Sequence, residues 1–480
     1  MSYIMLKKPI SAHPIAFLNI TQFMSALNDN VFKYLIVFLL INLLGAAHSS
    51  DILFWVGVIY VLPFLLFSSN AGILADRFSK QRLMIALKVL EIIIMALGII
   101  AFAYKSQLGL YALMFLLSLQ SALFSPPKYS VIPELVAQKS ISKANGIITS
   151  ATYLAIIAGT FLASFITQVT DKNFVFAGVV CLFIALIGWV ASLFIPYMPP
   201  KGTQKKMSPF FIRSIFHTLI ECSATPFLLM AICGSAFFLF IGAFFQLNII
   251  PFAINSLGLS EIGGGYLFLI CAIGIACGAQ IAGRLSKEQV EIGLSCLASL
   301  GVALSLILLF CVRSSLPGVI TNLFLLGFVS GFFIIPFDSF VQTFTQGHHR
   351  GQVIAANNFL SFCGVLLAPV ILYLISGVFN LSAAIGFIVM AIATFCYTLF
   401  LWLQATSHLL NFICRLLLKP KPKTLRAQFA AASFFIVYIQ TDHPSLWHRF
   451  LTLSTTFRII PKKGNVPKPA DHIKTIVWKA

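Results

Sequence analysis

Long apolar stretches recur along this chain from residue 15 to residue 407, separated by short segments that carry most of the polar and charged residues. A stretch of about twenty residues, at about 1.5 Å per residue in a helix, crosses the roughly 30 Å of hydrocarbon in a bilayer. The pattern therefore predicts twelve membrane-spanning helices. Their expected ranges are 15–44, 51–74, 83–103, 107–135, 142–168, 174–197, 223–257, 261–283, 290–312, 316–345, 351–378 and 382–407.

The composition agrees with this pattern. Hydrophobic residues make up 59% of the chain and charged residues only 9%, whereas charged residues make up about 25% of a soluble domain. The first apolar run follows Lys7 and Lys8 but is too long for a secretory signal and carries charges inside, so we expect an uncleaved first span. The chain is thus predicted to be an all-α integral membrane protein.

The cysteines give no indication of a metal site. The ten of them are scattered over apolar or membrane-edge segments without any CxxC pair, which is typical of small buried hydrophobic residues. None of the nine histidines stands in a zinc-type spacing with a cysteine. The sequence predicts neither a metal nor a cofactor.

The distribution of lysine and arginine predicts the orientation. If the N-terminus is cytoplasmic, the inside segments before the tail hold fourteen of these cations, and the outside loops hold only Lys105, Lys172 and Arg313. Cytoplasmic loops of membrane proteins carry such an excess of positive charge. Both termini are therefore predicted to be cytoplasmic.

The two halves of the apolar region resemble each other. The connection 198–222 divides the spans into six and six, and "ILADRFSKQR" (73–82) after the second span has a counterpart in "IAGRLSKEQV" (281–290) after the eighth. A repeated six-helix unit is typical of a two-lobed transporter whose site lies between its halves. The predicted domains are an N-terminal lobe (1–197), an inter-lobe loop (198–222), a C-terminal lobe (223–407) and a tail (408–480).

The tail is basic. Residues 419–480 carry eleven lysines and arginines against Asp442 and Asp471. We interpret the tail as a cytoplasmic segment that rests on anionic lipid headgroups, preceded by a short interfacial helix at 408–418. Nucleic-acid binding is the weaker alternative because no recognition motif is present. The apolar piece at 429–439 is too short to span a membrane.

The segment "GILADRFSKQR" (72–82), together with the twelve spans and the repeat, resembles the loop motif of the major facilitator superfamily. The resemblance implies close helix packing at Gly72 and a position for Asp76 near a helix end of the opposite half. It also implies that Arg77, Lys80 and Arg82 belong to a cytoplasmic charge network that latches one conformation. The alternative is that these cations only determine the orientation of the chain.

Three further segments, 23–40, 124–136 and 142–162, are similar to the lysophospholipid transporter branch of that superfamily, which includes fusions to a lipid acyltransferase. The resemblance implies transport of lysophospholipids from the outer to the inner leaflet of the bacterial inner membrane, where a cytosolic acyltransferase acts on the product. Gln246 and Thr149 stand where some members carry an arginine and a glutamate. The acyltransferase motif His-x4-Asp is missing after His443, so no such enzyme is expected in this chain.

Several ionisable residues lie inside the predicted spans, where they are costly and usually functional. Lys88 and Glu91, three residues apart near a cytoplasmic helix end, are explained by a local ion pair with a lysine that snorkels to the interface. Asp29 falls near the midplane of the first span and Lys33 one turn further on. These two side chains either pair with each other, which would serve packing, or bind substrate.

Lys128 and Asp338 occupy equivalent places in the repeat with opposite charge. A zwitterionic headgroup needs an anion for its ammonium and a cation for its phosphate. Asp29 and Asp338 are the predicted anions, and Lys33 and Lys128 are the predicted cations. Polar candidates for the same cavity are Asn30, Gln246, Asn248, Asn357 and Asn358, although hydrogen bonding between helices is the commoner role of such residues.

Two other functions remain open at this point. One is a major facilitator for a soluble solute or drug, coupled to protons through Asp29. The other is a membrane-bound enzyme of lipid metabolism. No set of nucleophile and base and no metal constellation is visible in the sequence, so we expect a transporter and not an enzyme.

Overall fold

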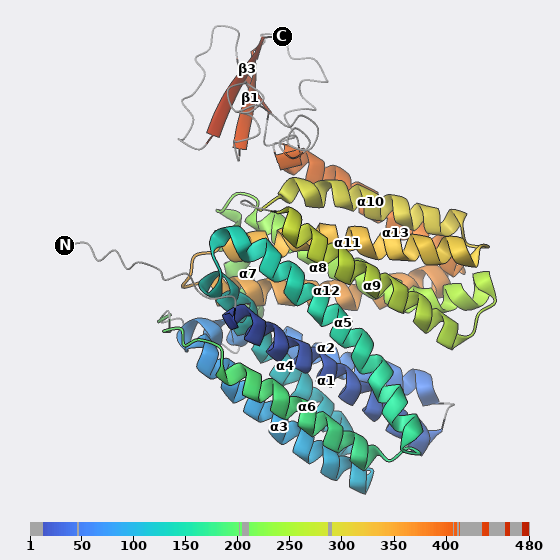
Figure 1. Cartoon of the computed structure of the whole chain (residues 1–480). Coiled ribbons are helices and arrows are strands. Elements are labelled where there is room, and N and C mark those ends of the chain that lie inside the picture. The colour runs from blue at the N-terminus through green and yellow to red at the C-terminus, as the bar shows by residue number, and fades with distance from the viewer. Residues whose placement is uncertain are drawn as a thin grey trace.

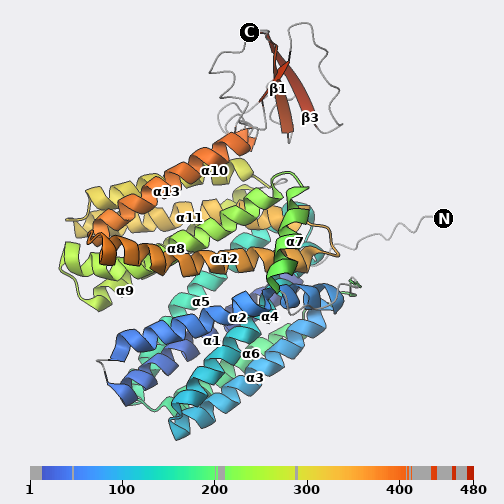
Figure 2. The same cartoon turned by 180° about the vertical axis from the view of Figure 1, so that it is seen from behind.

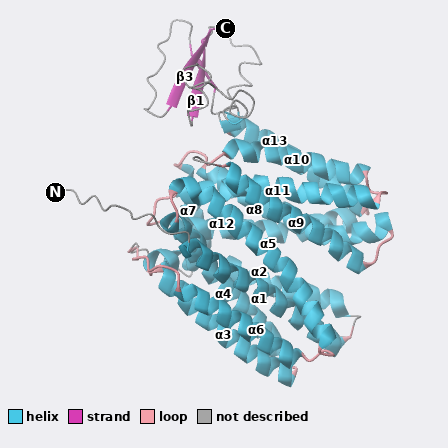
Figure 3. Ribbon diagram, in the orientation of Figure 1, coloured by secondary structure: helices cyan, strands magenta, loops and turns pink. Residues whose placement is uncertain are grey.

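The computed structural model describes residues 13–45, 48–200, 202–203, 211–286, 290–406, 408–409 and 412, with three tail strands at 434–440, 457–460 and 473–479. Helices account for nearly all of the described chain before the tail (Figures 1 and 3). Their bounds are α1 His13–Leu44, α2 Ser49–Arg77, α3 Lys80–Tyr104, α4 Gln107–Leu135, α5 Ile141–Val169, α6 Phe174–Leu193, α7 Phe211–Ser223, α8 Leu228–Leu257, α9 Glu261–Leu285, α10 Ile292–Cys311, α11 Leu316–Phe344, α12 Arg350–Tyr373 and α13 Ala383–Gln404. Two short turns, η2 Gln138–Ser140 and η3 Leu374–Val378, precede α5 and follow α12.

Among these described helices, twelve are long and apolar enough to cross a membrane, which confirms the predicted number of spans. Several begin with a side-chain cap that accepts a hydrogen bond from a backbone N–H of the first turn, as expected for Ser and Asn at this position. These caps are Ser106, Asn173, Ser260, Ser315 and Ser382. They allow the spans to turn back over short connections without leaving the first backbone donors unpaired.

The spans form two lobes, α1–α6 and α8–α13, which confirms the predicted fold class for the helical part of the chain (Figures 1 and 2). Each lobe has an apolar core of its own. Phe32, Met95 and Phe102 belong to a cluster built only from the first lobe, and Phe252 and Phe387 belong to one built only from the second. Because each lobe buries its own core, the lobes are able to move against each other as units.

The two lobes meet at the end of the bundle that carries α7 and the α2–α3 turn, which we call the α7 end. Here a Cβ atom at Gly72 of α2 would lie 2.7 Å from the carbonyl oxygen of Gly351 in α12. Between α5 and α11, the Asn145 amide donates to Gln342 Oε1 at 3.1 Å. Toward the opposite end the lobes diverge (Figures 1 and 2).

The tail contains a feature outside the predicted all-α class. Strands β1 (Phe434–Gln440), β2 (Phe457–Ile460) and β3 (Ile473–Lys479) form a parallel sheet in the order β2-β1-β3. The apolar piece noted at 429–439 falls largely in β1, whose sequence FFIVYIQ is rich in the aromatic and β-branched residues that favour strands. The interfacial helix expected at 408–418 lies mostly outside the described residues.

Candidate functional site

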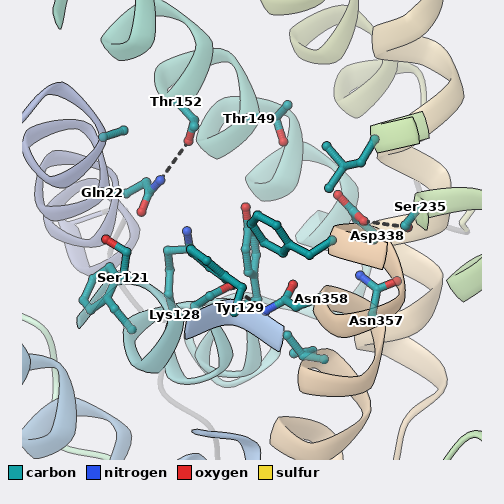
Figure 4. A pocket seen from close by; sticks show the side chains of 18 of the residues that line it. Gln22, Ser121, Lys128, Tyr129, Thr149, Thr152, Ser235, Asp338, Asn357 and Asn358 are labelled. Atoms are coloured by element: carbon teal, nitrogen blue, oxygen red, sulfur yellow. Dashed lines mark hydrogen bonds between the residues drawn. The ribbon is translucent and has the colours of Figure 1, made fainter. Parts of the chain in front are cut away.

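A cavity of about 330 Å³ lies where the two lobes face each other. Side chains of α1, α2, α4 and α5 line it from one lobe, and side chains of α8, α11 and α12 line it from the other (Figure 4). Helix α1 contributes Gln22, Ser25 and Asp29, whose spacing of three and four residues places them on one face. Helix α1 thus presents a polar stripe to the cavity.

Asp29 presents an unsatisfied acceptor. Ser121 Oγ donates to Asp29 Oδ2 at 2.7 Å, whereas the buried Oδ1 has no hydrogen-bond partner. The buried Oδ1 of Asn357, which lines the same cavity from α12, also lacks a partner. Because an unpaired buried acceptor is costly, these two oxygens are suited to a ligand that brings hydrogen-bond donors.

Asp338 and Lys128 supply opposite charges across the cavity. Asp338 accepts a hydrogen bond from Ser235 Oγ at 3.0 Å. The Lys128 ammonium lies 4.3 Å from the centre of the Tyr129 ring, and its side chain is 7% exposed. Figure 4 shows Lys128 on one side and Asp338 beside Ser235 on the other, with Tyr129 and Asn358 between them.

Among the described residues that line the cavity, the charged ones are Asp29, Lys128 and Asp338. They come from α1, α4 and α11, so their meeting depends on the packing of both lobes. Two carboxylates and one ammonium give the lining a formal charge of −1. A ligand that carries both an ammonium and an anionic group would find an opposite charge for each.

The structure brings together four of the six predicted binding residues: Asp29, Asn30, Lys128 and Asp338 line the cavity. Asn30 is already engaged with its own helix, because its amide donates to the Ala26 carbonyl at 2.8 Å. The additional candidates Asn357 and Asn358 line the cavity as well. Asn248 instead donates to the Ala383 carbonyl at 2.8 Å, which is the packing role that such residues commonly have.

Lys33 lies outside this lining. Its ammonium is 5.0 Å from the ring centre of Tyr34 and 5.5 Å from that of Tyr60, and it donates to Asn30 Oδ1 at 3.4 Å. The described structure contains no ion pair between Lys33 and Asp29. The alternative prediction, that these two side chains neutralise each other in a packing pair, is therefore wrong for this structure. Aromatic rings and an amide surround the cation instead.

Gln246 also lies outside the cavity, which departs from its predicted place. Its exposed side chain is seven residues beyond Leu239 on α8, on the same helix face but two turns further from the α7 end. The predicted seventh span began at residue 223, whereas α8 begins at Leu228. From Ser235, which lines the cavity, to Gln246 is about 16 Å of helix, which is too far for a shared site.

Sequence reasoning missed the aromatic part of the lining. Tyr60 and Phe64 of α2, Tyr153 of α5 and Phe362 of α12 all face the cavity, and the rings of Phe64 and Phe362 stack across the two lobes at 4.0 Å. Aromatic residues are so common in these spans that their spacing alone does not distinguish cavity from lipid. Gln22 and Ser25 were detectable, because they precede Asp29 at helical spacing.

The predicted local pair of Lys88 and Glu91 forms, with 2.5 Å between Lys88 Nζ and Glu91 Oε2. The expected snorkelling of Lys88 is wrong, because both side chains are fully buried. Asn28 donates to Glu91 Oε1 at 3.0 Å, and Lys88 donates to Ser25 Oγ at 3.0 Å. A buried charge pair persists when such hydrogen bonds satisfy it, and this one ties α3 to α1 inside the first lobe.

The predicted latch residues lie at the α7 end. Asp76 accepts hydrogen bonds from the backbone N–H groups of Gly351 at 2.8 Å and Gln352 at 3.1 Å. These are the first donors of α12, so the carboxylate caps a helix N-terminus of the other lobe, where negative charge is favourable. Its neighbour Gly72 makes the close approach of α2 to α12.

The latch cations contact their own lobe. Lys80 pairs with Glu134 of α4 at 2.9 Å, and the Arg82 guanidinium lies 5.2 Å from the ring centre of Tyr197. Arg77 is half-buried at the end of α2. Among the described residues no group of histidine, cysteine, aspartate and glutamate could hold a metal ion.

Comparison with known proteins identifies the family of this chain. The chain matches the family model described as Major Facilitator Superfamily over residues 18–369. A Klebsiella pneumoniae (strain 342) protein named lysophospholipid transporter LplT is 29% identical over 376 residues, which cover 76% of this chain and 87% of that protein. A protein of the same name from Yersinia pestis (strain Pestoides F) is 26% identical over 363 residues, covering 73% and 84%.

Solved structures share the fold. The human organic anion transporter MFSD10 (TETRAN) gives a TM-score of 0.69 at 15% identity and covers 82% of this chain and 100% of its own. A bacterial homologue of the iron transporter ferroportin in an outward-facing state gives 0.64 at 12% identity, covering 81% and 97%. The matched family and the named relatives are transporters, which confirms that the chain is not an enzyme and removes the lipid-metabolising alternative.

Proposed function

This chain belongs to the major facilitator superfamily, and we propose that it moves lysophospholipids across a membrane by alternating access. The observation that carries the proposal is the charge arrangement of the cavity. Asp29 and Asp338 face the same space as Lys128, and Asp29 Oδ1 has no partner. A phosphoethanolamine headgroup carries the ammonium and the phosphate that these side chains would bind. The relatives named lysophospholipid transporter support this choice of substrate class.

The headgroup and the acyl chain require different surroundings. In this proposal the polar stripe of α1 and the Lys128 ammonium bind the headgroup, and the single acyl chain leaves the cavity along aromatic residues such as Phe64 and Phe362. The cost of burying the headgroup charges is offset by opposite charges in the cavity. The acyl chain stays in an apolar environment throughout and therefore adds little to the barrier.

We further propose that transport runs from the outer to the inner leaflet of a bacterial inner membrane, with both termini in the cytoplasm. The α7 end is then cytoplasmic, and the described contacts between the lobes close that side. Rocking of the lobes would break the contact of Asp76 with α12 and the close approach at Gly72. Gly72, Asp76, Arg77, Lys80 and Arg82 would accordingly act as a conformational latch. A cytosolic acyltransferase acting on the product is the partner this direction implies.

The proposal is tested by a leaflet-relocation assay in proteoliposomes. Lysophosphatidylethanolamine, lysophosphatidylglycerol and free glycerophosphoethanolamine are labelled and supplied to one side. We expect the two lysolipids to become inaccessible to a quencher on the side of addition, with the ethanolamine lipid favoured because of the net negative lining. Uptake of the free headgroup with no movement of either lysolipid would indicate a transporter of soluble solutes and reject the proposal.

A further inference from the structure

Helix α7 differs from every other helix that the structure describes between α1 and α13. It has 13 residues, so it extends about 20 Å and is too short to span a bilayer. Figure 2 shows it crossing the bundle at the α7 end instead of running along the spans. It contacts α2 of the first lobe and both α8 and α12 of the second. The Phe211 ring lies 6.3 Å from that of Phe359 in α12.

Three faces follow one another around α7. Ile215, Thr218 and Cys222 are buried against the bundle. The next face carries Ile212, Phe216 and Ile220, four residues apart, which are 63%, 65% and 55% exposed. This second set is called the apolar stripe below. More than half of each large apolar side chain in it lacks contact with the protein, which is unfavourable in water.

The third face of α7 is polar. It carries Arg213, His217 and Glu221, all exposed, and the His217 ring lies 3.0 Å from Glu221 Oε1. The sequence directly before α7 adds Lys205 and Lys206. A short helix with one apolar face, one polar face and flanking cations is suited to the surface of an anionic membrane.

We propose that α7 binds the surface of the anionic cytoplasmic leaflet, with the apolar stripe inserted at the boundary between headgroups and acyl chains. Arg213 then lies at the level of the phosphates, and His217 and Glu221 face the cytosol. Because α7 also contacts α2 and α12, the helix ties the seam between the lobes to the leaflet. The lobes are unable to separate at this seam while α7 keeps both contacts. This inference does not depend on the identity of the substrate.

Photo-crosslinking in intact membranes tests the inference on the full chain. The photoreactive residue p-benzoylphenylalanine replaces, one at a time, Ile212, Phe216 or Ile220 of the apolar stripe. Matched controls replace His217 and Glu221, which are also exposed on the same helix and face the cytosol in this proposal. All five positions are exposed, so the replacements leave the buried packing of α7 intact. Adducts are identified by mass spectrometry of the purified protein.

We expect phospholipid adducts at the three stripe positions and several-fold fewer of these adducts at positions 217 and 221. Crosslinks from the stripe to another protein or to the tail of the same chain would overturn the proposal. Equal lipid adducts at all five positions, or none at the stripe, would overturn it too. The result is separate from transport of lysophospholipid, because the adducts report which molecules lie next to α7 and do not measure movement of a lipid between leaflets.

Discussion

Replacing Asp29 by Asn removes one charge from the cavity and almost nothing else. The amide has the same shape as the carboxylate, and its oxygen is able to keep the hydrogen bond that Ser121 donates at 2.7 Å. The second oxygen of Asp29 is buried without a hydrogen-bond partner. We therefore expect a melting temperature equal to or above that of the wild type, because an uncompensated buried charge destabilises the empty protein.

The same substitution should weaken binding of a lipid that carries an ammonium. A hydrogen bond to a charged group contributes about 1.5–3 kcal/mol, so its loss lowers the affinity for lysophosphatidylethanolamine by about 10- to 150-fold. Lysophosphatidylglycerol has no ammonium to pair with Asp29. Its affinity should remain within about threefold of the wild type, because only neutral contacts change.

The assay measures equilibrium binding of both lysolipids to purified protein, and then their relocation in proteoliposomes. Asp51→Asn is the matched control, because Asp51 is an exposed carboxylate in the first turn of α2, outside the cavity. The Asp29→Asn variant should change the ratio of the two affinities, and the control should leave it unchanged. Equal losses for the two lipids, in protein that melts normally, would refute the assignment of Asp29 to the ammonium.

Three further variants test other parts of the structure. Lys128→Gln should lower the affinity for both lysolipids by about tenfold or more, since both carry a phosphate. A loss of affinity for only one of the two headgroups would contradict this role. Asp76→Asn should weaken the hydrogen bond that caps the N–H of Gly351 by about 0.3–1 kcal/mol. The lobes should then separate more often at the α7 end, so cysteines introduced there should react faster with a soluble reagent; unchanged reactivity in inserted protein would argue against a latch. Glu91→Leu leaves Lys88 buried without its partner and should cost about 3–5 kcal/mol of stability, measured by thermal unfolding in detergent; an unchanged melting temperature would show that the pair is dispensable.

The twelve spans were predictable because each is a long apolar run with polar ends, and length alone identifies such a run. The position of Lys128 and Asp338 in one cavity was also predictable. They hold equivalent positions in a repeat, and a repeat that forms two lobes brings equivalent positions to the shared cavity. Neither inference required knowledge of side-chain packing.

The wrong predictions concern how far along its helix a side chain lies and the direction in which it points. Gln246 was assigned to the cavity because it stands where some family members carry an arginine. Such a match does not fix how far along the helix the side chain lies from the site, and each residue adds about 1.5 Å. The direction of Lys33 and the burial of Lys88 depend on neighbouring helices, Tyr60 of α2 in one case and Gly188 of α6 in the other. A pattern within one helix contains no information about them. Helix α7 was hidden inside a segment assigned as a loop.

The charges of the cavity have a consequence for the rate of the unloaded carrier. Asp29 belongs to one lobe and Asp338 to the other, and Lys128 is the single lysine or arginine among the described lining residues. Closing the outer mouth over an empty cavity removes water from both carboxylates, and a single cation neutralises only one of them. A bound phosphoethanolamine headgroup leaves the net charge at −1, because its phosphate offsets its ammonium, but the N–H groups of its ammonium replace the water that the carboxylates lose. The lobes should therefore reorient faster with bound lysolipid than without it. One-for-one exchange of lysolipid needs only the loaded carrier, whereas net movement also needs the unloaded carrier to return. Exchange should accordingly be faster than net movement.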